Sequence, residues 1–117
     1  MANNPQWTVE FYPDSRNRFP VREYIERLPE AEQAKVRNHI RLLREMGPNL
    51  PEPYAKHLKG YAPLCELRPV PHRVFYFQHR ATRFILLHAF HKKKLKTDRK
   101  EIERAHRRML DFQEREP

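Results

Sequence analysis

Several residue types on which many enzymes depend are scarce in this sequence. The chain has one cysteine, Cys65, one serine, Ser15, and two glycines, Gly47 and Gly60. A single cysteine excludes an intramolecular disulfide and a multi-cysteine zinc site. Two isolated glycines do not make a phosphate-binding loop, and a lone serine in a turn segment does not resemble a nucleophile elbow. The sequence therefore gives no support to nucleotide-triphosphate or covalent acyl chemistry.

Long apolar segments are also missing. No apolar run approaches the roughly 20 residues that span a bilayer, and residues 1–7 lack the apolar core of a signal peptide. We therefore expect a cytoplasmic protein with no membrane partner. A length of 117 residues suffices for one hydrophobic core, which predicts a single domain over residues 1–117.

Positive charge, in contrast, is abundant and confined to one part of the chain. Residues 56–100 include twelve lysines and arginines but only two acids, Glu66 and Asp98, for a net charge of +10. The whole chain carries +9, so the remainder is nearly neutral. A cationic excess confined to one segment is typical of nucleic-acid binding.

The apolar pattern predicts an α+β fold. Alternating apolar residues bounded by turn-forming residues indicate strands, and prolines followed by apolar residues at helical spacing indicate helices. We expect strands at residues 7–12, 64–68, 73–78 and 84–90, and helices at 20–28, at 29–46 and from 98 onward. The first two helices should form a hairpin on a four-stranded, mainly antiparallel sheet, with the C-terminal helix at its edge.

Seven histidines raise the question of a metal site. His88 and His91 lie three residues apart in a predicted strand, so their side chains should point to opposite faces of the sheet. No HExxH motif or paired-cysteine spacing is present. We expect neither a metal ion nor another cofactor.

The cationic segment suits cleavage of RNA by its own ribose 2′-hydroxyl. That reaction needs a base for the hydroxyl, cations for the phosphorane oxygens and an acid for the departing 5′-oxygen. Lysine, arginine and histidine can supply all three without a metal ion. The candidates are Lys56, His57, Lys59, Arg68, His72, Arg73, Tyr76, His88, His91, Lys92, Lys93 and Lys94.

Several short motifs follow one another along this segment. They are KHLKG at 56–60, ELR at 66–68, HRVFY at 72–76, the apolar run at 85–90, and the basic run at 92–96 that precedes Glu101 and Ile102. In this order and spacing they resemble the RelE/ParE toxin superfamily, and within it the HigB-type, phage-derived branch. The resemblance extends over residues 7–112, with specific motifs only from Lys56 onward.

The resemblance implies a RelE-like fold and a ribosome-dependent mRNA endonuclease, the toxin of a type II toxin–antitoxin system. Its partners would be a helix-turn-helix antitoxin, the ribosome and mRNA. It also implies that Arg73 contacts the scissile phosphate and that Lys93 assists. Relatives often use a C-terminal tyrosine or histidine as base, but no tyrosine follows Lys92 here, which leaves the general base open.

We predict a catalytic group of Arg73, Lys93, His91 and Glu66. Arg73 and Lys93 would stabilise the phosphorane, and His91, beside the lysines, is the first choice for proton transfer. Glu66 fits an orienting partner better than a base, and an ion pair between Arg73 and Glu66 across a hairpin is the alternative to phosphate contact. RNA phosphates would be bound by Lys56, His57, Lys59, Arg68, Lys92, Lys94 and Lys96.

Other roles stay open for three histidines. Residues two apart in a strand point to the same face of the sheet, so His88 should share a face with Leu86 and Phe90. It could be a core residue there or a functional one. His57 and His72 remain alternatives to His91 for proton transfer.

Two other functions remain open at this point. One is a ParE-like inhibitor that binds DNA gyrase and cuts nothing, and the other is a nucleic-acid-binding module without enzymatic activity. Independently of these functions, the alternative to RNA contact for Lys92, Lys93, Lys94 and Lys96 is a solvated approach to the last helix.

Overall fold

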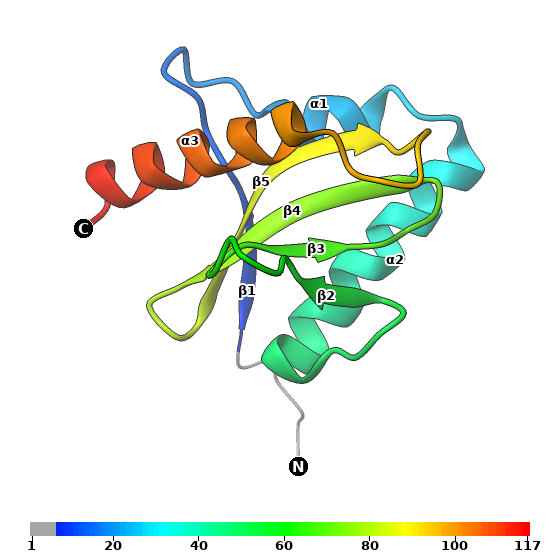
Figure 1. Ribbon diagram of the computed structural model, residues 1–117, viewed down its shortest axis with the longest axis horizontal. Coiled ribbons are helices and arrows are strands. Elements are labelled where there is room, and N and C mark those ends of the chain that lie inside the picture. The colour runs from blue at the N-terminus through cyan, green and yellow to red at the C-terminus, as the bar shows by residue number, and fades with distance from the viewer. Residues whose placement is uncertain (1–6) are drawn as a thin grey trace.

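The computed structural model describes residues 7–117 and shows an α+β fold built on one sheet (Figure 1). Residues 1–6, part of the stretch over which we predicted no signal peptide, lie outside the described residues. The elements are β1 (Thr8–Phe11), α1 (Pro20–Glu26), α2 (Glu30–Met46), a 3-10 turn η1 (Gly47–Asn49), β2 (Ala55–His57), β3 (Cys65–Leu67), β4 (His72–His79), β5 (Arg83–His91) and α3 (Arg99–Arg115).

The sheet has five strands in the order β1-β5-β4-β3-β2. β1 pairs with β5 in parallel, and every other neighbouring pair is antiparallel. The mainly antiparallel α+β prediction is confirmed, although four strands were expected. The additional strand, β2, spans three residues and follows a proline-rich connector, so it is too short for an alternating pattern to be recognised.

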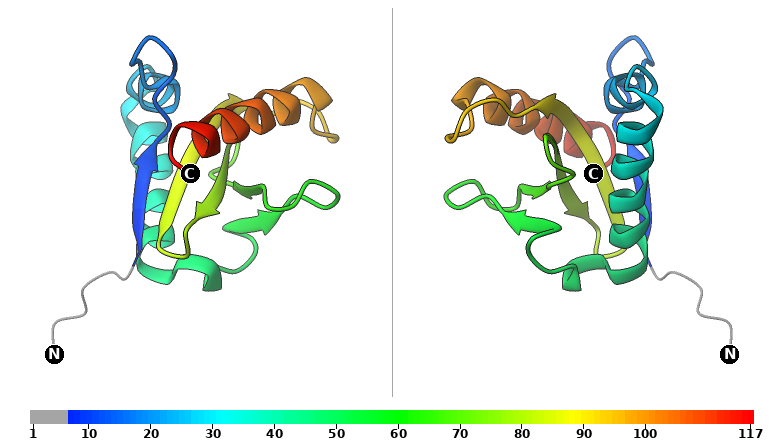
Figure 2. Two further views of the ribbon diagram at one scale, coloured as in Figure 1. Left: turned by 90° about the vertical axis from the view of Figure 1, so that its left-hand side faces the viewer. Right: turned by 90° about the vertical axis from the view of Figure 1, so that its right-hand side faces the viewer.

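Helices cover both faces of the sheet. Figure 2 shows α2 and α3 on opposite sides of it. The α1 and α2 helices form the predicted hairpin, and their apolar side chains enclose the first core together with Leu67, Val74, Tyr76, Phe84 and Leu86. The helix hairpin therefore packs on the sheet as expected.

The prediction that the C-terminal helix packs at the sheet edge is wrong. The apolar stripe of α3 is buried in a second core on the opposite face of the sheet, with side chains from β4 and β5. Its members include Phe75, Phe77, Ile85 and Leu87 from the sheet and Ile102, Ala105, Met109 and Phe112 from α3. The sequence predicted this stripe, but the face that it covers depends on tertiary contacts.

A β-bulge in β5 changes which residues share a face. Phe75 pairs with His88 whereas the next residue, Tyr76, pairs with Leu86, which leaves Leu87 as an extra residue. Leu86 therefore belongs to the core under α1 and α2, while His88 contacts Phe75, in the core under α3. The prediction that His88 shares a face with Leu86 is wrong, since parity fails across a bulge.

Candidate phosphate-binding site

The α3 side of the sheet carries a polar cluster next to its apolar core. Glu66 pairs with Phe75 across β3 and β4, and Lys56 pairs with Glu66 across β2 and β3. Residues paired across strands share a face, as do residues two apart in one strand, so Arg73 lies on the face of Phe75. The structure thus brings together three predicted site residues: Lys56, Glu66 and Arg73.

Arg73 is a buried cation whose hydrogen bonds are incomplete. The residue is 8% exposed, and its Nη1 donates to the carbonyl oxygen of His72 at 3.1 Å. Its Nε is buried and has no hydrogen-bond partner among residues 7–117. Burial lowers the pKa of Arg73, and the charge of Glu66 acts in the opposite direction. A buried N–H without an acceptor costs free energy, which an anion bound at Arg73 would offset.

Glu66 does not form an ion pair with Arg73. Its Oε1 lies 3.2 Å from Nε of Arg68, while no oxygen of Glu66 lies within 4.0 Å of an Arg73 nitrogen. The second carboxylate oxygen, Oε2, is buried and unpaired within the described part of the chain. Glu66 therefore orients Arg68, and the alternative in which it neutralises Arg73 is wrong.

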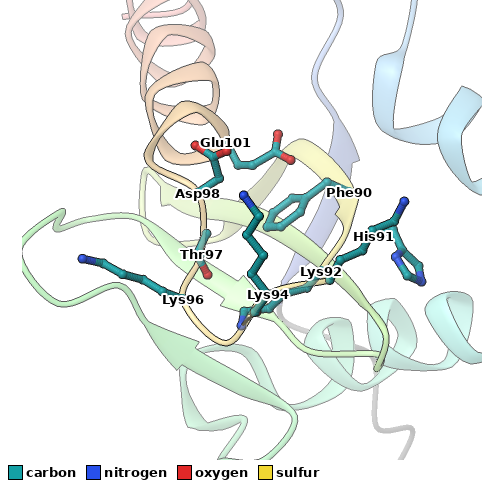
Figure 3. A pocket seen from close by; sticks show the side chains of 9 residues that line it. Phe90, His91, Lys92, Lys94, Lys96, Thr97, Asp98 and Glu101 are labelled. Atoms are coloured by element: carbon teal, nitrogen blue, oxygen red, sulfur yellow. Dashed lines mark hydrogen bonds between the residues drawn. The ribbon is translucent and has the colours of Figure 1, made fainter.

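The lysine loop, residues 92–96, follows β5 and borders a hollow of about 160 Å³ (Figure 3). Nζ of Lys92 donates to the carbonyl oxygens of Lys94 and Leu95, each at 2.6 Å, so this side chain closes the loop. Lys92 was predicted to bind RNA, but its ammonium group is used within the protein. Lys93, Lys94 and Lys96 are exposed.

His91 lies at the end of β5, away from Arg73. His72 pairs with His91, and their rings meet edge to face with centroids 5.5 Å apart. Arg73 instead pairs with Phe90, so Arg73 and His91 point to opposite faces of the sheet. His91 is nevertheless exposed and borders the hollow beside the lysine loop, and Figure 3 shows its ring reaching away from that hollow.

His72, an alternative for proton transfer, is held between two helices. Its Nδ1 lies 2.7 Å from the hydroxyl of Tyr24 in α1, and its Nε2 lies 2.6 Å from Oε1 of Glu32 in α2. Both ring nitrogens therefore have partners, and the residue is buried. His72 links the two helices to β4.

The β2 residues alternate between the two faces of the sheet. His57 Nδ1 lies 3.2 Å from Sγ of Cys65, whereas Lys56 points to the face of Glu66. Burial raises the pKa of Cys65 to about 11, so the thiol stays protonated near neutral pH. Lys56 and Lys59 are exposed, and Nζ of Lys56 lies 3.9 Å from Glu52. His57 is thus separated from the Arg73 face.

His88 lies on the same face of the sheet as Arg73 and Phe90, and not on that of Leu86. It is 6% exposed, its Nε2 lies 2.8 Å from Oε1 of Glu101, and its Nδ1 lies 3.3 Å from Nη1 of Arg108. Its ring stacks on Phe90 at an interplanar angle of 17°. Burial lowers the pKa of His88, which favours a neutral ring that accepts from Arg108 and donates to Glu101.

The described residues were also compared with the requirements of a metal site and of a membrane-spanning helix. Over residues 7–117, no group of three or more His, Cys, Asp or Glu side chains is placed to hold a metal ion. None of the helices in this range combines the length and the apolar character needed to cross a membrane.

Comparison with models of protein families identifies the family to which the chain belongs. Residues 23–110 match the sequence model of the family described as "Phage derived protein Gp49-like", which covers more than half of the 117 residues. The chain belongs to this family. The match to the Gp49-like family runs from α1 into α3, and so includes Glu66, Arg73 and the lysine loop. None of the curated proteins matches the chain.

Proposed function

We propose that this Gp49-like protein is a ribosome-dependent mRNA endonuclease, the toxin of a type II toxin–antitoxin system. The observation that carries the proposal is the buried Arg73, whose Nε N–H has no acceptor among the described residues, on the face that Lys56 shares. The motif resemblance to the HigB-type branch of the RelE/ParE toxins and the phage-derived family support it. In this proposal the partners are a helix-turn-helix antitoxin, the ribosome and mRNA.

The proposed reaction needs no group beyond the RNA and the side chains. The ribose 2′-oxygen attacks the adjacent phosphorus, the bond from phosphorus to the 5′-oxygen breaks, and a 2′,3′-cyclic phosphate and a 5′-hydroxyl result. Negative charge grows on the equatorial oxygens of the phosphorane, where the guanidinium of Arg73 would donate hydrogen bonds. Lys93, exposed on the lysine loop, would add a second positive charge.

Proton transfer is proposed for His91, which projects from the face opposite Arg73, so the RNA would have to pass around the end of β5 to meet both residues. Its ring is exposed at the end of β5 and borders the hollow beside the lysine loop, so RNA can reach it. His88 is less suited because Glu101 and Arg108 occupy both of its ring nitrogens. His72 lies on the same face as His91, but Tyr24 and Glu32 occupy both of its ring nitrogens.

Docking would use the remaining cations near the site. Lys94 and Lys96 are exposed on the lysine loop, Lys56 and Lys59 are exposed at β2, and Arg68 is held by Glu66. Contacts of this kind position a phosphate backbone without reading its sequence.

Primer extension on translated mRNA after expression of the protein tests the proposal. Wild type should produce new 5′ ends, and Arg73→Ala should abolish them, because loss of one transition-state donor costs about 10²–10³ in rate. Arg44→Ala, at an exposed position of α2, is the matched control and should cleave like wild type. Intact transcripts with wild type, or unchanged cleavage by Arg73→Ala, would contradict the proposal. DNA breaks during continued translation would instead indicate gyrase inhibition.

A further inference from the structure

Three arginines of α3 have no acidic partner within 4.0 Å among the described residues. Arg104, Arg107 and Arg108 are spaced so that they share one side of the helix. No carboxylate oxygen of residues 7–117 lies within 4.0 Å of any of them. Like charges at this spacing repel each other. The arrangement therefore costs free energy unless an anion is bound.

These arginines border a hollow between α3 and the segment that follows β1. The arginine hollow has a volume of about 320 Å³ and is lined by Tyr12, Arg104, Arg107, Arg108 and Asp111. Asp111, its one acid, is already engaged, because Oδ2 accepts from the Tyr12 hydroxyl at 2.6 Å and from Nη2 of Arg115 at 2.7 Å. The hollow thus keeps an excess of positive charge.

Arg108 is held in a fixed orientation at the base of this cluster. Its Nη1 donates to the carbonyl oxygen of Leu87 at 2.8 Å and contacts Nδ1 of His88 at 3.3 Å. Burial and the charges of Arg104 and Arg107 lower the pKa of Arg108, while Tyr12 and Asp14 act in the opposite direction. An anion in the hollow would relieve this repulsion while Arg108 stays in place.

We propose that the arginine hollow binds a phosphate of an RNA backbone, as a second phosphate site separate from Arg73. The proposal rests on the proposed function for its choice of RNA as ligand. Guanidinium groups match phosphate oxygens through paired hydrogen bonds, and a site of several arginines is well suited to such contacts.

Charge along the surface favours RNA over an isolated anion. Arg99 and Lys100, exposed at the start of α3, join the lysine loop to Arg104. Two acids of this segment are engaged, since Asp98 caps α3 by accepting from the backbone N–H of Lys100 and Glu101 contacts His88, while Glu103 is exposed. A single phosphodiester chain can therefore contact the lysine loop and continue to the arginine hollow.

Fluorescence anisotropy with labelled single-stranded oligo-uridine over a series of salt concentrations tests the proposal. The test variant is Arg104→Gln with Arg107→Gln, at exposed positions where glutamine keeps the helix. Losing two phosphate contacts should weaken binding at low salt about tenfold or more and reduce the log–log salt slope by about 1.4. The control, Arg37→Gln with Arg44→Gln on α2, removes the same charge from exposed positions and should change the slope much less. Equal affinity and slope in the two double variants would overturn the proposal.

Two further measurements separate RNA binding at the arginine hollow from mRNA cleavage and from binding of an acidic protein. Binding is measured in the Arg73→Ala background, so the result does not depend on cleavage. If wild type fails to cleave mRNA but the slope still drops, the proposed function fails and the second phosphate site stands. Labelled polyglutamate serves as an acidic polypeptide: loss of its binding by the hollow variant, with RNA binding unchanged, would overturn the RNA site in favour of a protein partner.

Discussion

His72 and Arg73 are neighbours in β4, yet they meet opposite conditions on the two faces of the sheet. His72, 2% exposed, has both ring nitrogens paired, with Tyr24 and Glu32. Arg73 keeps an N–H without an acceptor among residues 7–117. Buried polar groups with complete hydrogen bonds stabilise a fold, whereas an incomplete one calls for an explanation, such as a bound water, an ion or a catalytic role. His72 is therefore a structural residue, and Arg73 is the one for which we propose a functional role.

Substitution of Arg73 should have the largest effect on activity. Arg73→Met keeps the aliphatic volume but removes the guanidinium, so we expect cleavage to fall by about 10²–10³. Stability should stay equal or rise, because a buried unpaired N–H is removed. Primer extension and urea unfolding measure the two effects on the same protein. A loss of stability with intact cleavage would reverse the assignment.

Substitution of His72 should show the opposite pattern. His72→Phe leaves the Tyr24 hydroxyl without its partner and should lower the free energy of unfolding by about 1–3 kcal/mol. Tyr24→Phe removes the same hydrogen bond and should cost about 1 kcal/mol. Cleavage per folded molecule should be retained in both variants, as measured by mRNA cleavage normalised to the folded fraction. Lost cleavage at unchanged stability would place His72 in the reaction.

A smaller effect should separate two exposed lysines. Lys93→Ala removes a charge proposed to face the phosphorane, so we expect about a tenfold lower kcat, which equals about 1.4 kcal/mol. Lys59→Ala should raise KM and leave kcat unchanged, since a docking contact acts on bound substrate and transition state alike. Steady-state cleavage by ribosomes programmed with a defined mRNA gives both constants. Identical effects of the two variants would remove Lys93 from the chemistry.

The smallest predicted effect is on the pH dependence of stability. It involves two buried histidines, His88 in β5 and His39 in α2. Burial lowers the pKa of His88 and of His39. In the unfolded chain a histidine titrates near 6.5, so below about pH 6.5 the unfolded state binds more protons and stability falls as pH decreases. His88→Gln and His39→Gln should each reduce the stability difference between about pH 7 and pH 5. Urea unfolding at both pH values measures this stability difference, and His106→Gln, at an exposed position of α3, is the control. A difference that stays unchanged in both the His88 and the His39 variant would contradict the burial argument.

Periodicity and turn residues predicted most of the fold. Alternation identified four of the five strands, and the proline at the start of α1 together with the cap Asp98 located the helices. The sequence could not show that Leu87 forms a bulge, because an extra residue in a strand leaves no mark on an apolar run. Sequence alternation therefore grouped Leu86 with His88 and Phe90, although only His88 and Phe90 share the Arg73 face.

The positions of the candidate site residues could be predicted only in part. Charge and motif order made Arg73 a candidate, and strand pairing puts it on the same face as Glu66 and Lys56, two other candidates. That Lys92 closes its own loop could not be foreseen, since a run of lysines looks alike whether or not one folds back. His91 was chosen for its place beside the lysines, but its side chain lies on the face opposite Arg73.

The central claim is that the guanidinium of Arg73 receives a phosphate. Nitrogen-15 NMR of arginine Nε–Hε groups during titration with uridine 3′-phosphate tests it most directly. The Arg73 resonance, assigned by its absence in Arg73→Lys, should shift on binding, while that of Arg44 on α2 should not. An Arg73 resonance that stays unchanged at saturating nucleotide would contradict the claim.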